Sequence, residues 1–365
     1  MTDITIVLGT RPEIIKLSPV VRACEEREIP CTVIHTGQHY SDELDSVFFE
    51  RLELPEPDVN LKVGSENHGK QTGEMLIHLE EVLLDKTPDV VLVQGDTNSV
   101  LAGAIATSKL NAEVAHVEAG LRSFDRDMPE EVNRIVADHV ADYLFAPTEE
   151  TQELLLEEGI PEERIYVTGN TIVDAVIANR ELAAEKSTIL EDLNLKSGQY
   201  ILMTAHRAET VDDQDVFRSV LDGVDRVATA LDVPVVYPIH PRSRNKIGEF
   251  DIAVPDSIRL IDPVDFLDFL RLEDDAMLAM TDSGGVQEET CIMGTPCVTF
   301  RDSTERPETV DVGSNVVVGT ASNAILDGAK SQVEKSNDWE NPFGEGDAAT
   351  RILDAILQST QESKR

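Results

Sequence analysis

The sequence lacks any run of apolar residues that approaches the roughly 20 needed to cross a bilayer as a helix. It also lacks a C-x-x-C pair, since Cys24, Cys31, Cys291 and Cys297 stand apart. Isolated cysteines of this kind are typical of reduced thiols in the core of a cytoplasmic protein. The chain opens directly into an apolar strand-like segment, so we expect no signal peptide. These absences predict a cytoplasmic protein that is not inserted in a membrane.

Basic residues are scarce: 31 lysines and arginines face 70 aspartates and glutamates, a formal net charge of -39. This balance argues against a nucleic-acid partner, whose phosphates would meet a repulsive field. The acidic residues are spread over helix faces, as in 149–158. Their mutual repulsion destabilises a compact fold unless salt screens it, as at about 1 M, where the Debye length is roughly 3 Å. The composition resembles that of proteins from salt-accumulating halophiles, and an acidic mesophilic enzyme is the alternative.

The motifs of several enzyme classes are missing, including G-x-G-x-x-G and H-E-x-x-H. Segment 64–71 nearly matches the phosphate loop G-x-x-x-x-G-K-[ST], but Gln71 lacks the hydroxyl that Mg²⁺ needs. We interpret it as a loop before a helix over 71–84. Asp125 and Asp127 resemble the D-x-D pair of metal-dependent enzymes, but they follow a loop, and we interpret them as a solvated turn. We expect neither a metal nor a cofactor.

Short apolar, β-branched runs alternate with longer amphipathic segments along the whole chain. This alternation is typical of parallel α/β architecture with both sheet faces covered. At 365 residues, two domains are favoured over one. We expect a first α/β domain over 1–174, a helical connection over 175–199, a second α/β domain over 200–346, and a C-terminal helical segment over 347–365 that packs back on the first domain.

Polar residues follow directly after the predicted strands in both halves. In open parallel sheets, ligands bind beyond the carboxyl ends of the strands. Two facing sheets that form one central cleft are therefore indicated. The strands expected on this basis are 277–280 and the runs Ile4–Leu8, Cys31–Ile34, Val90–Val93, Val114–Val117, Ile165–Val167, Ile201–Met203, Val235–Tyr237 and Pro296–Phe300.

The segment 277–289 gives the strongest indication of a ligand. Its apolar run ends at Ser283-Gly284-Gly285, and a helical pattern containing Glu289 follows. Glycines at a strand-to-helix turn let backbone N–H groups approach an anion, which the helix N-terminus also favours. Glu289, one turn into the helix, would hold a diol beside bound phosphates, as in a nucleoside diphosphate. For the glycine pair alone, an ordinary tight turn is the alternative.

Three carboxylates are candidates for acid–base chemistry. Asp96 and Glu118 each follow an apolar strand, and Glu130 lies at a proline-led helix start. Together they would supply the acid and base that proton transfer at a sugar carbon requires. Helix capping or N-terminal charge is the alternative for each of them, and for Glu130 alone it has equal weight.

Basic residues at strand ends of so acidic a chain indicate an anionic ligand. The candidates for this cationic complement are Arg11, Lys16, His206 and Arg306. For Arg306, a surface pair with Glu305 or Glu308 is the alternative.

Several long motifs, in the same order along the chain, resemble those of the non-hydrolysing UDP-N-acetylglucosamine 2-epimerases. The resemblance runs from about Ile4 to Leu357. It implies a glycosyltransferase-B-like fold of two Rossmann-like domains, with a UDP-sugar in the cleft. The motifs are Gly9–Glu13, Gly95–Thr97, His116–Arg122, Pro129–Arg134, Asp282–Gly285 and Thr304–Glu308.

The resemblance also implies an activity and a set of residue roles. The activity is the reversible conversion of UDP-GlcNAc to UDP-ManNAc through 2-acetamidoglucal and UDP. By position, Asp96, Glu118 and Glu130 match the catalytic carboxylates, with the acid and base unassigned. We count His206 with both the catalytic and the UDP-binding residues, and Lys16 with the latter. The positions that match UDP contacts are Arg11, His206, Ser283, Gly284, Gly285, Glu289 and Arg306.

One departure concerns regulation. Bacterial members that their own substrate activates carry Gln-His-Arg after the second strand, whereas this chain has Gln38-His39-Tyr40. We therefore expect the regulatory substrate site to be absent. The same residues occur in relatives that act on UDP-2,3-diacetamido-glucuronate, so the C3 and C6 groups of the substrate stay open. A UDP-sugar glycosyltransferase and a non-catalytic nucleotide-sugar sensor are two further functions that the sequence leaves open. We expect a homodimer.

Overall fold

The computed structural model describes residues 2–38 and 48–363, which divide into two compact units. Unit 1 comprises Met1–Ala175 with Phe343–Arg365, and unit 2 comprises Val176–Pro342. The sequence pattern set residues 175–199 apart as a connection, and all of them except Ala175 lie in unit 2. Among the described residues, no helix combines the length and the apolar character needed to cross a membrane.

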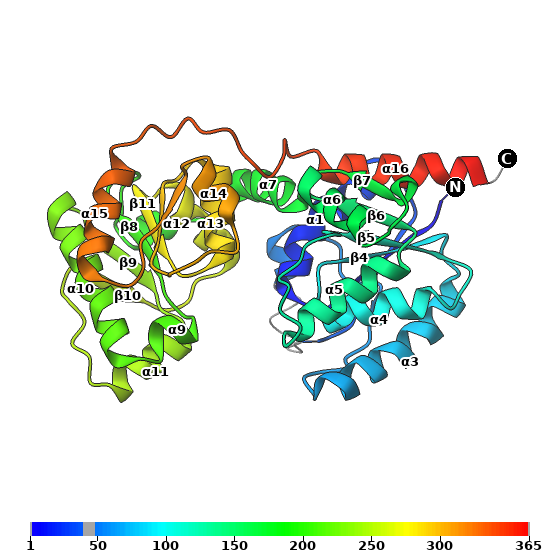
Figure 1. Ribbon diagram of the computed structural model, residues 1–365, viewed down its shortest axis with the longest axis horizontal. Coiled ribbons are helices and arrows are strands. Elements are labelled where there is room, and N and C mark those ends of the chain that lie inside the picture. The colour runs from blue at the N-terminus through cyan, green and yellow to red at the C-terminus, as the bar shows by residue number, and fades with distance from the viewer. Residues whose placement is uncertain (1, 39–47, 364–365) are drawn as a thin grey trace. The chain divides into compact units, whose positions relative to one another are not determined.

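Unit 1 is built on a seven-stranded parallel sheet with the order β3-β2-β1-β4-β5-β6-β7. Strands β4, β5, β6 and β7 of this sheet are labelled in Figure 1. Its strands are β1 (Ile4–Leu8), β2 (Cys31–His35), β3 (Val59–Asn60), β4 (Val90–Gln94), β5 (Glu113–Val117), β6 (Tyr143–Ala146) and β7 (Ile165–Val167). Every residue of β1, β4 and β6 is buried, as expected when helices cover both faces of a parallel sheet.

The helices of unit 1 lie on both faces of this sheet. On one face α3 packs on α4 and α4 on α5, and on the other α1 packs on α16. The side chain of Asp174 accepts hydrogen bonds from the first N–H groups of α16, which fixes the start of this C-terminal helix. The helices are α1 (Arg11–Glu26), α3 (His68–Lys86), α4 (Asn98–Thr107), α5 (Pro129–Val140), α6 (Glu149–Glu157), α7 (Thr171–Lys186, which continues into unit 2), α16 (Ala348–Ser363) and a 3₁₀ turn, η1 (Glu162–Arg164).

Unit 2 contains a six-stranded parallel sheet with the order β10-β9-β8-β11-β12-β13. Counted from the first strand of each unit, this is the 3-2-1-4-5-6 order of the Rossmann fold, which unit 1 shares and extends by one strand. The strands are β8 (Ile201–Thr204), β9 (Val235–Pro238), β10 (Ile258–Ile261), β11 (Leu278–Thr281), β12 (Cys297–Thr299) and β13 (Asn315–Val317).

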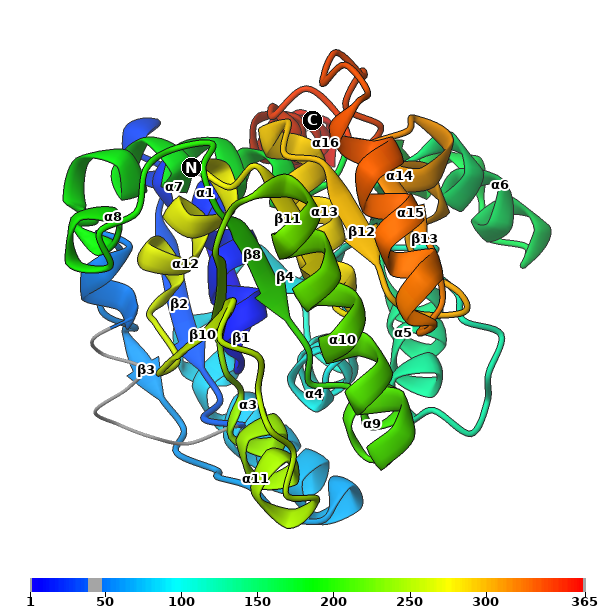
Figure 2. The same cartoon turned by 90° about the vertical axis from the view of Figure 1, so that its left-hand side faces the viewer.

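The core of unit 2 lies between the sheet and the strongly amphipathic α10, which runs beside α15 (Figure 2). Asp213 caps α10 by accepting from the N–H groups of Asp215 and Val216, so local sequence fixes where this helix begins. The helices are α8 (Ile189–Asp192), α9 (Ala208–Val211), α10 (Gln214–Leu231), α11 (Pro241–Glu249), α12 (Phe266–Asp274), α13 (Gly284–Met293), α14 (Pro307–Asp311) and α15 (Ser322–Val333).

Candidate active site

The turn between β11 and α13 leaves a helix N-terminus open. Ser283 is the N-cap residue of α13, but its side chain makes no capping hydrogen bond. A Cβ on Gly284 or Gly285 would meet no atom closer than 3.8 Å, so internal packing does not require either glycine. Such a turn suits the close approach of a ligand, and an open helix N-terminus favours an anion.

A pocket of about 370 Å³ adjoins this turn. Its lining comes from the loops after β8, β9, β10 and β11, at the carboxyl edge of the sheet. The polar lining residues include His206, Ser283 and Glu289, and the apolar ones are Pro238, Pro263, Val264 and Phe269 among others. A few polar groups in a mostly apolar lining are typical of a nucleotide-sized ligand site.

The buried side chain of Asp282 organises the loop that carries His206. Its Oδ2 accepts from the backbone N–H groups of His206 and Arg207, at 2.8 and 2.9 Å. Its Oδ1 lies 3.2 Å from His206 Nδ1, which leaves Nε2 of the ring for a ligand. Burial alone would raise the pKa of Asp282, but His206 and the two N–H groups lower it overall. A fixed carboxylate thus orients the imidazole.

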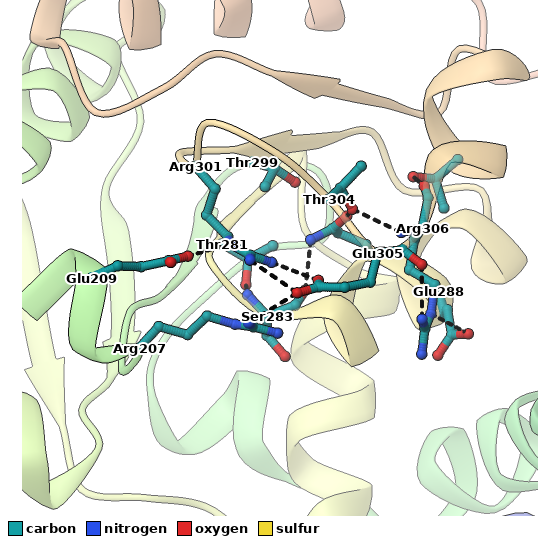
Figure 3. Close-up of polar contacts among 12 residues, drawn as sticks. Arg207, Glu209, Thr281, Ser283, Glu288, Thr299, Arg301, Thr304, Glu305 and Arg306 are labelled. Atoms are coloured by element: carbon teal, nitrogen blue, oxygen red, sulfur yellow. Dashed lines mark hydrogen bonds and ion pairs between the residues drawn. The ribbon is translucent and has the colours of Figure 1, made fainter. Parts of the chain in front are cut away.

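Arg306 is held by acidic and backbone groups of unit 2 (Figure 3). Its Nε lies 2.6 Å from the buried Glu288 of α13, and its Nη1 donates to the backbone carbonyl of Glu305 at 2.9 Å. Sequence reasoning named the side chains of Glu305 and Glu308 as possible partners and did not anticipate Glu288. The contacts tie the loop after β12 to the first turns of α13.

A second arginine braces the same loop. Arg301 is 6% exposed and forms ion pairs with Glu305 at 2.7 Å and with Glu209 at 2.6 Å, while Arg207 lies 3.2 Å from Glu305 (Figure 3). Burial raises the pKa of Glu305 but its hydrogen bonds with Arg301 outweigh this and lower the value to about 2. Glu305 is therefore ionised at neutral pH. Neither Arg301 nor Glu209 was predicted to have a role.

In unit 1, Glu118 directly follows β5 and takes a left-handed backbone conformation, with φ of +65°. This conformation is uncommon outside glycine and costs of order 1–3 kcal/mol, and such residues cluster at functional sites. The side chain is 7% exposed. Its Oε1 accepts from Lys16 Nζ at 2.5 Å and its Oε2 from Gln94 Nε2 at 2.6 Å. Lys16, predicted as a UDP contact, thus contacts a candidate catalytic carboxylate.

Asp96 lies in the turn between β4 and α4, close enough to Glu118 for their charges to interact. Burial and the nearby Glu118 raise the pKa of Asp96, although Arg134 of α5, which forms an ion pair with its Oδ2, and Lys16 work against the shift. A carboxyl group whose pKa is raised by burial and by a neighbouring acid is a candidate for acid or base chemistry.

Glu13 is a further buried acid at this edge of the sheet, and no role was predicted for it. It is 3% exposed and accepts hydrogen bonds from Gly9 N, Thr10 Oγ1 and Thr97 Oγ1, at 2.7 to 2.9 Å. Burial raises its pKa to about 7 despite these donors. Glu13 therefore links the loops after β1 and β4 and can change protonation near neutral pH.

His116 supports the loops after β4 and β5. Its Nδ1 lies 2.6 Å from Asp138 Oδ1 and its Nε2 lies 2.8 Å from the carbonyl oxygen of Gly95. Because a carboxylate and a carbonyl both accept, the ring is doubly protonated. Burial alone would lower the pKa of His116, but Asp138 and Gly95 raise it overall. Asp138 also pairs with Arg122 at 2.7 Å, so a buried network braces the loops that carry Asp96 and Glu118.

Two predicted residues of unit 1 are not joined to this cluster by a described hydrogen bond or ion pair. Glu130 begins α5 after Pro129, and among the described contacts no hydrogen bond or ion pair joins it to Asp96 or Glu118. Its neighbour Glu131 is the buried one and accepts from the N–H groups of Ser123 and Phe124. Arg11 is exposed in the first turn of α1, 6.0 Å from the ring of Phe48.

The remaining sequence motifs have plain structural roles. Gln71 lies in the first turn of α3, which begins at His68. Its side chain donates to the backbone carbonyls of Gln38 and Gly64. Asp125 accepts from the N–H of Asp127 in an exposed turn. Within residues 2–38 and 48–363, no three His, Cys, Asp or Glu side chains group as a metal site. His39 and Tyr40, on which the regulatory prediction rests, lie outside the described residues.

His240 was missed as a site residue. It lines the pocket of unit 2, and its ring lies 5.6 Å from that of His206, centroid to centroid. Burial, His206 and Arg242 lower its pKa, so it favours the neutral form. The sequence could have indicated this role, because His240 follows β9 and so lies at the same sheet edge as His206.

The family model for UDP-N-acetylglucosamine 2-epimerase matches residues 22–357. The chain is 50% identical to the UDP-N-acetylglucosamine 2-epimerase of Methanocaldococcus jannaschii, over 96% of this chain and 97% of that protein. It is 40% identical to the UDP-2,3-diacetamido-2,3-dideoxy-D-glucuronate 2-epimerase of Pseudomonas aeruginosa, over 96% of this chain and 98% of that protein.

Solved structures agree with these relationships. The crystal structure of the M. jannaschii enzyme in complex with UDP-GlcNAc and UDP matches with a TM-score of 0.84 at 49% identity, covering 98% of this chain and all of that one. A glycosyltransferase from Rickettsia africae matches with a TM-score of 0.57 at 14% identity, covering 99% and 97%, and shares the fold alone. The predicted α/β fold of two Rossmann-like domains, of the glycosyltransferase-B-like type, is confirmed. With its family model and its relatives in agreement, the chain belongs to the UDP-N-acetylglucosamine 2-epimerase family.

Proposed function

We propose that this chain converts UDP-GlcNAc reversibly to UDP-ManNAc. The observation that carries the proposal is the buried Glu118 carboxylate, held in a strained backbone conformation beside Asp96. Strain of this kind persists where the surrounding structure fixes a functional group. The activities named for the relatives support the same reaction.

In the proposed reaction, a base removes the proton from C2 of the sugar while the C1–O bond to UDP breaks. The electron pair of the C–H bond forms the C1–C2 double bond of 2-acetamidoglucal, and UDP leaves with the electrons of the C–O bond. UDP then adds back to C1 while an acid delivers a proton to the opposite face of C2. Asp96, Glu118 and Glu130 are the proposed acid and base residues, and proton transfer of this kind contributes typically about 10²–10⁴-fold.

Unit 2 supplies the proposed nucleotide site. The open N-terminus of α13 at Ser283, Gly284 and Gly285 would bind the diphosphate, and His206 Nε2 would stabilise the charge that develops on departing UDP. Glu289 would accept from the ribose hydroxyls, and the apolar pocket wall suits the uracil. Arg306 would contact UDP while its side chain stays paired with Glu288.

The relative that acts on a diacetamido-glucuronate favours a second candidate substrate with the same C2 chemistry. A glycosyltransferase on this fold would need an acceptor and a single base, and the clustered acids of unit 1 speak against it. We also propose that the chain works in the cytoplasm as a homodimer, which sedimentation at several concentrations would test.

The test is incubation of the pure protein with UDP-GlcNAc in D₂O, without an acceptor, followed by NMR at C2. Deuterium is expected at C2 of both UDP-GlcNAc and UDP-ManNAc. A parallel sample with UDP-2,3-diacetamido-glucuronate distinguishes the two substrates. If both sugars keep their C2 protons, the chain is not an epimerase of either.

A further inference from the structure

Glu273, in the last turn of α12, is an acid placed in the interior of unit 2. Its side chain is fully buried. Within residues 2–38 and 48–363, neither of its carboxyl oxygens accepts a hydrogen bond. An ionised carboxylate in such a place would cost several kcal/mol, so a proton has to neutralise it.

The charged groups around Glu273 are acidic. Glu289 of α13 and Asp274 of α12 both face it, and burial together with these neighbours raises the pKa of Glu273 well above its usual range. The thiol of Cys297 in β12 is also close, and burial raises its pKa to about 12, so it stays neutral. Two arginines pair with the acids that follow Glu273 in the sequence: Arg180 with Asp274, and Arg271 with Asp275.

Because α12 packs on α13, the carboxyl groups of Glu273 and Glu289 lie within reach of a hydrogen bond once one of them is protonated. Because Glu273 is fully buried and Glu289 is partly exposed, burial favours the neutral form of Glu273, so the proton belongs to Glu273 and Glu289 accepts. Glu289 is partly exposed and lines the pocket of unit 2, one turn into α13. The neutral Glu273 thus lies on the buried side of Glu289, whose carboxylate lines the nucleotide pocket.

We propose that Glu273 is a positioning residue, which stays protonated and donates to Glu289 so that the Glu289 carboxylate is aimed at the ribose hydroxyls of the bound nucleotide. This inference rests on the proposed nucleotide site and adds a residue to it. The pair carries one negative charge instead of two, which also limits repulsion of an anionic ligand.

Two variants separate hydrogen bonding from packing. Glu273→Gln keeps an N–H donor and nearly the same shape, whereas Glu273→Met fills the volume without a donor. We expect Glu273→Gln to bind UDP within about twofold of wild type, and Glu273→Met to bind about tenfold more weakly, the scale of one hydrogen bond to a charged group. The KM for UDP-GlcNAc should rise in Glu273→Met while kcat is kept.

The ligand supplies the second half of the test. Calorimetric titrations of both variants with UDP and with 2′-deoxy-UDP show whether Glu273 acts through the ribose. Wild type should lose affinity on removal of the 2′-hydroxyl, and Glu273→Met should lose much less. If Glu273→Met weakens both ligands equally, or Glu273→Gln is as weak as Glu273→Met, Glu273 does not position Glu289.

A spectroscopic readout does not depend on the methionine variant folding. The infrared difference between wild type and Glu273→Gln at neutral pH should contain the C=O stretching band of one protonated carboxylic acid. Its absence would overturn the proposal. Wild type that does not bind UDP at all, yet shows this band, would instead contradict the nucleotide site and hence the proposed function.

Discussion

The two units share a strand order, but the helix N-terminus at corresponding turns is capped in unit 1 and uncapped in unit 2. In unit 1, the turn from β4 into α4 is closed by its own side chain, because Thr97 Oγ1 accepts from Val100 N and donates to Glu13. In unit 2, the corresponding turn from β11 into α13 has Ser283 at the N-cap and no capping bond. One helix N-terminus is satisfied internally, and the other is left open for an anion.

In each unit, a buried acid links the loops that follow the two central strands, and the pKa of this acid shifts in opposite directions in the two units. Glu13 of unit 1 joins the loops after β1 and β4, and burial raises its pKa to about 7. Asp282 of unit 2 joins the loops after β8 and β11, and its donors lower its pKa. The corresponding loops are therefore linked by an acid whose pKa is near neutrality in unit 1 and by an acid that is ionised at neutral pH in unit 2.

The largest expected effect comes from removing the carboxylates of unit 1. Glu118→Gln and Asp96→Asn should each lower the rate of deuterium exchange at C2 by about 10²-fold or more, because each removes a positioned acid or base. NMR in D₂O with saturating UDP-GlcNAc measures this rate. The exposed Glu80→Gln on α3 is the matched control and should exchange like wild type. A Glu118→Gln enzyme with wild-type exchange would remove Glu118 from the mechanism.

Glu13→Gln is expected to change how stability responds to pH. The folded state holds the Glu13 proton more tightly than the unfolded chain, since the pKa rises from 4.5 to about 7. The resulting stability, about 3 kcal/mol, is present below pH 4.5 and is lost as the pH rises through about 7. Urea denaturation should show the wild type losing stability relative to Glu13→Gln over this range. A constant difference would mean that Glu13 stays ionised in the fold.

Gly284→Ala tests whether the open turn of unit 2 exists for a ligand. The protein leaves room for the methyl group, and alanine in a helix is favoured over glycine by up to about 1 kcal/mol. The variant should therefore melt at the same or a higher temperature, yet bind UDP roughly tenfold more weakly, the scale of one lost charge-assisted hydrogen bond. Unchanged UDP affinity would mean that the turn before α13 is an ordinary structural turn and does not bind the ligand.

Ionic strength should have the smallest effect on the two sites and act on both units alike. The net charge of -39 repels itself over a Debye length of about 30 Å at 0.01 M salt, whereas close pairs such as Lys16 with Glu118 are screened less. Melting temperature and activity are expected to rise between about 0.05 and 3 M KCl, where the screening length falls to about 2–3 Å. Flat or falling profiles would contradict a halophilic adaptation.

The sequence predicted those parts of the fold in which apolar runs end in distinctive turn residues. The run 277–280, followed by Ser283, Gly284 and Gly285, located both β11 and the open turn of α13. Strands without such an ending escaped notice. β3 has only two residues, β6 follows α5 after a gap of only two residues, and β10 contains the charged Arg259.

The contacts within the site were beyond sequence reasoning because they join distant residues. Lys16 reaches Glu118 across 102 positions, so its pairing depends on β1 and β5 lying in one sheet. Glu273 lies in the charged run Glu273–Asp275, which is typical of an exposed helix end, yet its side chain is fully buried. Only the packing of α12 on α13 places this acid beside Glu289.

The division of work between the units is tested most directly by titrating Glu118→Gln with UDP in a calorimeter. If unit 2 alone holds the nucleotide and Glu118 serves only the proton transfer, the variant should bind UDP within about twofold of wild type while its C2 exchange is about 10²-fold slower. A Glu118→Gln protein that loses UDP affinity as strongly as Gly284→Ala would contradict the account, because the carboxylate would then belong to the nucleotide site.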